Sequence, residues 1–324
     1  MLLTLVNPLP RALAHYADAL RDNLGDPAIE VRDQDIERGS GRIGQVADAA
    51  RLRLGRELAG HRAVVLWPTF GALEPLTWRL SRAAAVDVVV HDPVPIREQR
   101  FTGPRWEGLA RRSGVGRVHF LTHTEAAATA LRGQLPGGAR VDAIPHPIKP
   151  AAARAATAHE GKRLLVLGQH KPTRDLDLLS ELAAIRPDGW DLRVAGRGWP
   201  AIPGWDVREG FLAEAELDAE LDAATVLLVP YRRYWQSGVA VRALERALPV
   251  VGRRHEFLEG LLGTGWPGLV DDTSDDEAAR MWQAAVALAA APAAEIEAVR
   301  DAASEHARKA WQRWAGMRAL QARS

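Results

Sequence analysis

The chain has no cysteine and no long apolar run, and its positive and negative charges nearly cancel. Without cysteine, disulfides and thiolate metal sites are excluded, and a reducing compartment fits this composition. The 42 basic and 41 acidic side chains leave a net charge of +1, whereas a general nucleic-acid binder carries a clear basic excess. No apolar stretch approaches the roughly 20 residues that span a bilayer, and residues 1–10 lack the basic segment of a signal peptide. We therefore expect a cytoplasmic protein that binds no nucleic acid.

The sequence does contain a regular alternation of short apolar, β-branched runs with Ala- and Leu-rich helical patterns. In 324 residues with 47% hydrophobic side chains, this alternation predicts parallel sheets covered by helices. The predicted strands are 2–6, 63–67, 86–90, 117–122, 141–144, 163–168, 191–195, 225–229, 249–252 and 268–270. The clearest helical patterns between them are 11–23, 125–134 and 175–185.

The predicted strands fall into two series, which are separated by a proline-bounded stretch. Residues 146–150 read His-Pro-Ile-Lys-Pro, and the weakly patterned, Ala-rich segment 151–161 follows. Such a composition is typical of a linker, so we place a domain boundary after residue 150. At the other end, residues 293–323 form one long helical pattern in which Trp311 and Trp314 share an apolar face. That face predicts packing against another element.

The most informative segment links a strand to a helix through a basic and aromatic loop. The strand 225–229 ends in Pro230, the loop begins at Tyr231, and Gln236-Ser237-Gly238 opens a helix that runs to Leu248. The first N–H groups of a helix have no partner within it, and the helix dipole favours negative charge there. The turn therefore predicts a site for an anion such as a diphosphate.

A second strand-end loop, residues 168–175, carries two more cations, Lys171 and Arg174. In a doubly wound sheet, ligands bind at the carboxyl ends of the strands, so this loop and the Gln-Ser-Gly turn are expected to face one crevice. Both cations suit a diphosphate, the arginine through paired hydrogen bonds. The alternative is a solvated loop that only caps a helix.

The two loops together resemble motifs of family-four-type bacterial glycosyltransferases. One subgroup of that family carries a Phe-Gly-x-Ile-Arg-Pro-Tyr-Lys-Gly loop and a Leu-Pro-Tyr…Gln-Ser-Gly-Val turn. This chain has Leu167-Gly168-Gln169-His170-Lys171-Pro172-Thr173-Arg174-Asp175 and Val229-Pro230-Tyr231…Gln236-Ser237-Gly238-Val239. Arg193-Val194-Ala195-Gly196 also looks like the family's strand-then-Ala-Gly loop.

The resemblance implies an α/β protein of the GT-B fold, with two Rossmann-like domains facing a central cleft. Residues 1–150 would bind the acceptor, residues 151–295 the nucleotide sugar, and residues 296–324 would form a helix returning to the first domain. The activity would be sugar transfer from a nucleoside-diphosphate sugar to a hydroxyl acceptor, in polysaccharide synthesis for example. The expected donor-site residues are Gly168, Lys171, Arg174, Gly196, Tyr231, Gln236, Ser237, Gly238 and Val239.

The same resemblance implies that no metal or other cofactor is needed, because the loops themselves neutralise the leaving diphosphate. The acceptor would be a glycan, a lipid-linked intermediate or a small molecule, with peripheral contact at the inner face of the membrane. His91, after the strand 86–90, would lie near the acceptor as a base or a hydroxyl ligand; the alternative is a histidine that caps the strand end. Asp92 is a second candidate base, whereas His123 and His146 are expected to be structural.

Two rival functions remain at this stage. Many relatives carry two glutamates eight residues apart around the turn. Here the corresponding positions fall at Tyr234 or Trp235 and at Arg242 or Ala243, which favours a non-catalytic or scaffolding homologue. The second rival is an NAD(P)-dependent oxidoreductase, because residues 39–44 match a dinucleotide-binding fingerprint, but no buried strand precedes them.

Two further features leave a choice between binding and structure. Residues 271–276 are mostly acidic, and we interpret them as a solvated loop capping a helix and not as a metal site. Trp235, next to the Gln-Ser-Gly turn, either stacks on a sugar or base or packs against the neighbouring domain.

Overall fold

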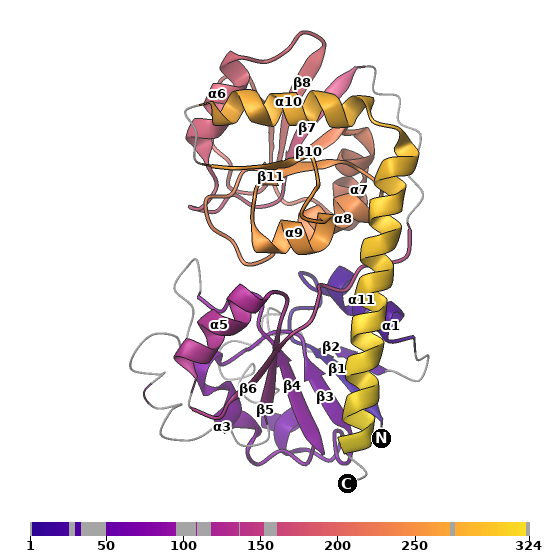
Figure 1. Ribbon diagram of the computed structural model, residues 1–324. Helices are drawn as coiled ribbons and strands as arrows, with labels where there is room; N and C mark the ends of the chain where they lie inside the picture. Colours follow the sequence, from indigo (N-terminus) through magenta and orange to yellow (C-terminus); the bar gives the residue numbers. More distant parts are fainter. Residues whose placement is uncertain are drawn as a thin grey trace. The chain divides into compact units, whose positions relative to one another are not determined.

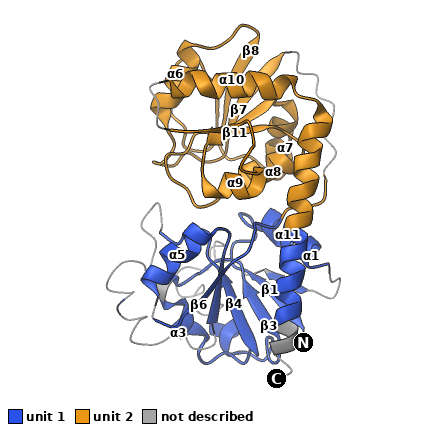
Figure 2. Cartoon of the chain, in the orientation of Figure 1, with its two compact units in different colours: residues 1–147, 307–324 blue, residues 148–306 orange. Residues whose placement is uncertain are grey.

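The computed structural model of the chain contains two α/β units (Figure 1). It describes residues 2–25, 30–33, 50–94, 108, 118–135, 137–151, 161–272 and 276–321. Unit 1 comprises residues 1–147 and 307–324, and unit 2 comprises residues 148–306 (Figure 2). The sequence places boundaries after residues 150 and 295. The units divide three residues before the first predicted boundary. The second division falls after residue 306, within the terminal helix α11 (Ala293–Gln321), because that helix belongs in part to each unit.

Six parallel strands form the sheet of unit 1, in the order β2-β1-β3-β4-β5-β6. The strands are β1 (Leu3–Asn7), β2 (Glu30–Asp33), β3 (Arg62–Val65), β4 (Ala85–Val89), β5 (Val118–Thr122) and β6 (Arg140–Ala143). The connecting elements include α1 (Ala14–Leu24), the short 3-10 helix η1 (Gly71–Leu73), α3 (Glu74–Trp78) and α5 (Glu125–Gln134). The inner strands β1, β3, β4 and β5 are buried along nearly their whole length, which explains their continuous apolar runs.

The end of α11 belongs to the core of unit 1. Trp311 is 0% exposed and Trp314 is 2% exposed, and both pack in a cluster with Leu5 and Leu20. The indole Nε1 of Trp311 donates a hydrogen bond to the carbonyl of Pro145 at 2.9 Å. The predicted packing of this apolar helix face is therefore confirmed.

The sheet of unit 2 also has six parallel strands, in the order β12-β11-β10-β7-β8-β9. The strands are β7 (Lys162–Leu167), β8 (Trp190–Gly196), β9 (Asp206–Glu209), β10 (Val226–Val229), β11 (Val250–Arg253) and β12 (Leu269–Val270). The helices are α6 (Leu176–Ala184), α7 (Glu214–Ala223), α8 (Gly238–Glu245), α9 (Glu256–Leu262) and α10 (Glu277–Ala290), followed by α11. Trp282 of α10 ties two helices together, because its Nε1 donates to the Leu182 carbonyl of α6 at 2.9 Å.

The strand order of unit 2 places a topological switch point between β7 and β10. From β7 the chain continues to β8 and β9 on one side of the sheet, and it later returns to β10, β11 and β12 on the other. In such sheets ligands bind beyond the carboxyl ends of the strands at the switch point. The loops that follow β7 and β10 are the two loops that the sequence predicts to bind an anion.

Both sheets confirm the predicted α/β class with parallel strands. The sequence missed β2 and β9, and both are four-residue edge strands whose residues are mostly charged, Glu-Val-Arg-Asp and Asp-Val-Arg-Glu. Edge strands lack the buried apolar run on which strand prediction relies. The glycine-rich residues 39–44 lie outside the described residues.

Candidate anion site at the switch point of unit 2

Helix α8 begins at the Gln-Ser-Gly turn, as its sequence predicts. Ser237 is the N-cap, and its hydroxyl accepts a hydrogen bond from the N–H of Ala240 at 3.3 Å. Gly238 is exposed, and a Cβ placed on it would meet no atom within 4 Å. The space in front of the helix N-terminus is therefore open on the glycine side. Gln236 and Val239, on either side of the turn, are half-buried.

The loop after β7 brings Arg174 next to this helix. A Cβ on Gly168 would lie 3.2 Å from Nη2 of Arg174 and 3.4 Å from Cγ2 of Val239. Only a residue without a side chain leaves both groups in place, and Gly168 also has φ +96°, which glycine adopts readily. The guanidinium and the first turn of α8 thus meet at the end of β7.

Arg174 is buried between aromatic rings, whereas the sequence suggests a cation in an open loop. The side chain is 6% exposed, and its guanidinium carbon lies 4.4 Å from the ring centre of Tyr231 and 5.0 Å from that of Trp199. Its Nη2 donates to the carbonyl of Leu167 at 2.9 Å. A planar guanidinium can stack on aromatic rings and is held in one orientation, whereas a lysine ammonium has no plane to stack.

The Arg174 guanidinium has no carboxylate partner within the part of the chain that the structure describes. Its Nε is buried and has no hydrogen-bond acceptor there. Burial lowers the pKa of Arg174, because the charged form loses hydration, and the nearby Tyr231 offsets this only in part. A buried charge without a counter-charge is costly. An anion bound beside Arg174 would remove that cost, so this side chain is the strongest sign of a ligand in unit 2.

Gly196 and Trp199 fix the end of β8 against the loop after β7. A Cβ on Gly196 would lie only 2.3 Å from the carbonyl oxygen of Gly168, so no other residue fits there without moving the backbone. The Trp199 Nε1 donates to that same carbonyl at 2.7 Å. Gly196 therefore acts through close backbone packing, a role that the sequence motif leaves open. Trp199 was not predicted, although it follows the Ala-Gly loop directly.

Lys171 and Tyr231 complete the set of predicted donor-site residues. Lys171 is half-buried, and its carbonyl accepts the Arg174 N–H at 2.9 Å, which closes a turn. Tyr231 pairs with Arg174 through an isolated antiparallel bridge, so the loops after β7 and β10 are joined by their backbones. Trp235, in the same loop, is half-buried.

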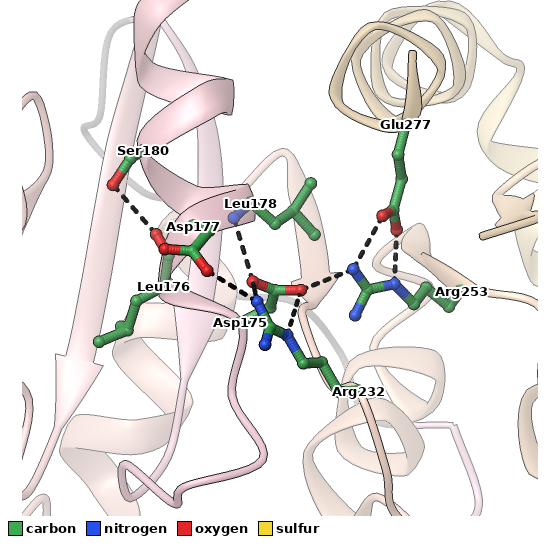
Figure 3. Close-up of polar contacts among 8 residues, drawn as sticks. All are labelled: Asp175, Leu176, Asp177, Leu178, Ser180, Arg232, Arg253 and Glu277. Atoms are coloured by element: carbon green, nitrogen blue, oxygen red, sulfur yellow. Dashed lines mark hydrogen bonds and ion pairs between the residues drawn. The ribbon is translucent and has the colours of Figure 1, made fainter. Parts of the chain in front are cut away.

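The Asp175 carboxylate joins three strand-end loops, and the sequence did not predict this role (Figure 3). It is the N-cap of α6, where it accepts the N–H of Leu178 at 3.2 Å. Both its oxygens accept hydrogen bonds from Arg232 at 2.8 Å, and Oδ2 also pairs with Arg253 at 2.6 Å. Arg232 belongs to the loop after β10, and Arg253 is the last residue of β11.

Hydrogen bonds of the backbone and side chains reinforce this junction. The N–H of Asp175 donates to the Pro230 carbonyl at 2.9 Å, and the N–H of Arg232 donates to the Thr173 carbonyl at 2.8 Å. Glu277 at the start of α10 holds Arg253 through both carboxylate oxygens. Burial alone would raise the pKa of Asp175, but hydrogen bonds from Arg232 and Arg253 hold it well below its usual range.

Two charged residues of α8 are committed to structural contacts. Arg242, one of the two positions at which the resemblance places a glutamate (the other is Ala243), pairs with Glu214 at 2.6 Å and with Asp218, both on α7. Glu245 is 2% exposed and accepts the backbone N–H of Lys149 at 2.7 Å.

In unit 1, His91 follows β4 and is 3% exposed. Its Nε2 lies 2.9 Å from the Leu66 carbonyl, and its ring stacks on Trp67 with the ring centres 5.5 Å apart. His91 thus has the strand-end contact of a capping histidine, and it is also placed at the carboxyl edge of the sheet, where ligands bind. Asp92 next to it is half-buried.

The described part of the chain offers neither a metal-binding group nor a membrane-spanning helix. No group of three histidine, aspartate or glutamate side chains there is arranged to hold a metal ion. No helix in those ranges is long and apolar enough to cross a membrane.

Of the acidic loop 271–276, Asp271 pairs with Arg254 at 2.8 Å, and residues 273–275 lie outside the described residues.

Comparison with known proteins shows the fold. No protein-family model and no curated protein matches the chain. Among solved structures, it is similar to a sucrose-phosphate synthase from Thermosynechococcus elongatus, with a TM-score of 0.69, 13% identity and 99% of both chains covered. A UDP-forming α,α-trehalose-phosphate synthase from Burkholderia vietnamiensis gives a TM-score of 0.63 at 14% identity, with 99% of this chain and 98% of that chain covered.

TarM is also similar, with a TM-score of 0.63 and 13% identity over 84% of this chain. The chain spans 58% of the length of TarM. These similarities confirm the predicted GT-B fold of glycosyltransferases. At such low identity they establish the fold alone, and the chemistry has to be argued from the site.

Asparagine in place of Asp175 is expected to destabilise unit 2 by about 2–3 kcal/mol, because it leaves two arginines without their shared, nearly buried carboxylate. Urea unfolding at pH 7 measures this. Asp177→Asn is the matched control, because Asp177 pairs with the same Arg232 but is 84% exposed. Its effect is expected to stay within about 0.5 kcal/mol.

The same variant has a defined pH dependence. Because the folded-state pKa of Asp175 is depressed, its contribution is complete above the unfolded value of about 4 and is lost as the pH falls below it. The stability difference between the parent and Asp175→Asn should therefore shrink in acid. A difference that stays constant from neutral pH to pH values well below about 4 would show that the carboxylate charge does not hold the loops.

Proposed function

We propose that this protein is a glycosyltransferase that moves a sugar from a nucleoside-diphosphate sugar to a hydroxyl group of an acceptor. The observation that carries the proposal is the buried Arg174, which lacks a carboxylate partner within the described residues and lies beside the open N-terminus of α8. An anion with several oxygens can accept from the guanidinium and from the helix N–H groups together. The similarity in fold to a UDP-forming synthase supports a nucleoside diphosphate as that anion.

In the proposed reaction, unit 2 holds the donor and stabilises the leaving group. The acceptor oxygen bonds to the anomeric carbon, the bond from that carbon to the diphosphate breaks, and the diphosphate leaves with the electron pair. Negative charge then grows on the diphosphate, where Arg174 and the N–H groups of α8 are already in place. Fixed donors of this kind lower the barrier because they need no rearrangement during the reaction.

We assign the acceptor to unit 1, with His91 as the base that takes the proton of the acceptor hydroxyl. Its position at the carboxyl edge of the sheet and the family resemblance support this role. The acceptor would be a glycan, a lipid-linked intermediate or a small molecule. The reaction would take place in the cytoplasm, with peripheral contact at the inner face of the membrane.

A second candidate function is binding of a nucleotide sugar without transfer. The pairing of Arg242 with Glu214 and Asp218 favours it, because the resemblance places a glutamate that contacts the donor at Arg242 or Ala243. Both functions predict nucleotide binding, but only the transferase consumes its donor. Release of UDP or GDP from a panel of nucleotide sugars, followed with and without added acceptors, separates the two.

Arg174→Gln is expected to weaken the binding of UDP and GDP by about 1.5–3 kcal/mol, the scale of a charge-assisted hydrogen bond. Isothermal titration calorimetry measures the change. Arg186→Gln is the control, because Arg186 is exposed and lies at the opposite, amino-terminal side of β8, so it removes the same charge far from the site. Equal losses in both variants would mean that net charge, and not the Arg174 site, attracts the nucleotide.

Gly238→Val should weaken nucleotide binding at least about tenfold, because its side chain fills the space that the ligand needs in front of α8. It should leave the thermal unfolding of unit 2 nearly unchanged, since a Cβ at this position meets no atom within 4 Å. Calorimetric titration combined with a melting curve tests both statements. Full affinity in a folded Gly238→Val protein would place the diphosphate elsewhere.

His91→Gln should lower transfer by a factor of about 10²–10⁴, the range attributed to a general base, and leave UDP affinity as in the parent. Glutamine keeps an N–H for the Leu66 carbonyl, so the local contact survives. Single-turnover rates and calorimetry on the same preparation provide the two values. Loss of UDP binding in His91→Gln would contradict the assignment, because it would show that unit 1 contributes to the donor site.

A further inference from the structure

A cavity of about 500 Å³ lies in unit 2, where the ends of α9 and α10 meet the beginning of α11. This volume is in the range of cavities that bind small molecules. The lining is mostly apolar and includes the side chains of Leu262, Trp266, Leu288, Ile296 and Val299. Of the described residues that line the cavity, only Glu295 carries a charge. An apolar cavity with one carboxylate is a candidate binding site.

The cavity lies at the amino-terminal edge of the sheet in unit 2. The Trp266 Nε1 donates a hydrogen bond to the carbonyl of Val250, the first residue of β11, at 2.7 Å. Helices α9 and α10 both begin at the opposite, carboxyl edge, where Glu277 of α10 holds Arg253, and both end at the cavity. The cavity is therefore separate from the candidate anion site.

The indole of Trp266 forms a fixed wall of the cavity. The residue is 7% exposed, its N–H donates to the Gly263 carbonyl at 3.1 Å, and its carbonyl accepts the Leu269 N–H at 3.1 Å. A Cβ on Gly268 would lie 2.5 Å from the Trp266 Nε1, so the backbone packs directly against the ring. The wall is thus in place before a ligand binds, as is usual for small-molecule sites.

Apolar side chains of three helices meet around the cavity without filling it. Leu262 ends α9, Leu288 lies near the end of α10 and Ile296 lies near the start of α11, and all three are buried. Val299, further along α11, is half-buried. An apolar body in the cavity would remove the remaining surface of these side chains from water, which favours binding.

The charge around the cavity is negative. Glu295 is exposed and contributes a full charge from the first turn of α11. Helices α9 and α10 end at Leu262 and Ala290, and the residues that follow them, Gly263 and Ala291, line the cavity. The C-terminus of a helix carries a partial negative charge, whereas the N-terminus of α11 has the opposite sign, which Glu295 offsets. A protonated amine suits this environment, and a carboxylate does not.

The positive charges nearest to the lining are already compensated. Arg254 donates to a carbonyl of the loop before β12, and it pairs with Glu259 and Asp271 at 3.0 and 2.8 Å. Arg300, next to Val299 in the chain, pairs with Asp301 at 2.8 Å. Neither arginine therefore reverses the negative charge that Glu295 brings to the cavity.

We propose that this cavity binds a small molecule that combines an apolar body with a protonated amine. The apolar body lies against Trp266 and Leu288, and the ammonium group pairs with the Glu295 carboxylate at the exposed side. Such a ligand contacts the end of α10 and the start of α11 together. The inference does not rest on the proposed function, because the cavity and the anion site use different residues at opposite edges of the sheet.

Ligand-observed nuclear magnetic resonance titration of the full chain tests the cavity with three probes of similar shape. Phenethylamine carries the amine, 2-phenylethanol has the same body without a charge, and phenylacetate is an anion. The amine should bind about three- to fivefold more tightly than the alcohol, the upper range for an exposed ion pair, and phenylacetate should bind most weakly. The preference for the amine should shrink in about 1 M salt, which screens exposed charges.

Glu295→Gln removes the charge and nearly keeps the shape. This variant should bind the amine and the alcohol with equal affinity, and its affinity for the alcohol should match that of the parent. Glu297→Gln is the matched control, because Glu297 is exposed on the same helix but is not among the lining residues. The control should keep the preference for the amine.

Ala287→Trp fills the space that the apolar body needs. Ala287 lines the cavity and is exposed, so the larger side chain should leave the protein folded, which a melting curve checks. All three probes should bind at least about tenfold more weakly, because the indole occupies their volume. Val286→Trp is the control, since Val286 is 39% exposed on the same helix and is not among the lining residues.

Specific results would overturn the proposal. They are equal affinity for the three probes, a preference for phenylacetate, no binding of any probe up to about 100 mM, or full affinity in a folded Ala287→Trp protein. If Ala287→Trp fails to fold, the comparison of Glu295→Gln with Glu297→Gln decides the question. UDP and GDP binding is measured separately, so failure of the proposed function leaves this site standing, and the reverse also holds.

Discussion

The Asp175 carboxylate holds together the segments at the carboxyl edge of the sheet in unit 2. Three loops leave β7, β10 and β11 at that edge, and each has its own connection to a helix. Without a link they would be free to move apart, as loops beyond strand ends commonly do. Asp175 caps α6 from the first loop, binds Arg232 of the second loop and pairs with Arg253, the last residue of β11 (Figure 3). This carboxylate, together with the backbone bridge between Arg174 and Tyr231, sets the spacing between the two loops of the switch point.

Asp175 and Arg174 are neighbours in the chain but have different electrostatic environments. The charge of Asp175 is fully compensated by arginines, and this compensation makes the junction rigid. Arg174 beside it is held by aromatic rings and one carbonyl, with no carboxylate within the described residues. A rigid frame therefore presents a buried cation next to the N-terminus of α8. An anion bound in the proposed donor site would meet this cation already in place, and such an arrangement would stabilise a leaving diphosphate.

The sequence predicts the α/β class, most inner strands and the two loops of the switch point, because buried parallel strands and helix starts have local signatures. It could not predict the junction, since Asp175 lies 57 residues from Arg232 and 78 from Arg253. Such a pair becomes visible only after the strand order is known. For the same reason Arg232, which flanks the Gln-Ser-Gly turn and looks available for a phosphate, turns out to be paired with two aspartates.

The gathering of His91, His123 and His146 has the same origin, because three separate strand ends become neighbours only in the folded sheet. Gly196 shows the opposite case, in which the sequence identifies a residue but does not reveal its role. Gly196 stands in a recognisable motif, but its role is set by the 2.3 Å that a Cβ would leave to the Gly168 carbonyl. Sequence motifs predict which loops form the candidate site, and the contacts made by the fold show which of its residues position their neighbours.

The most direct test of the central claim is calorimetric titration of the unmodified protein with uridine, UMP and UDP, and with the matching guanosine series. If the switch point of unit 2 is a diphosphate site, affinity should rise with each phosphate, and the diphosphate should bind at least about tenfold more tightly than the monophosphate. Equal affinities for nucleoside, monophosphate and diphosphate, or no binding of either diphosphate at millimolar concentration, would contradict the account.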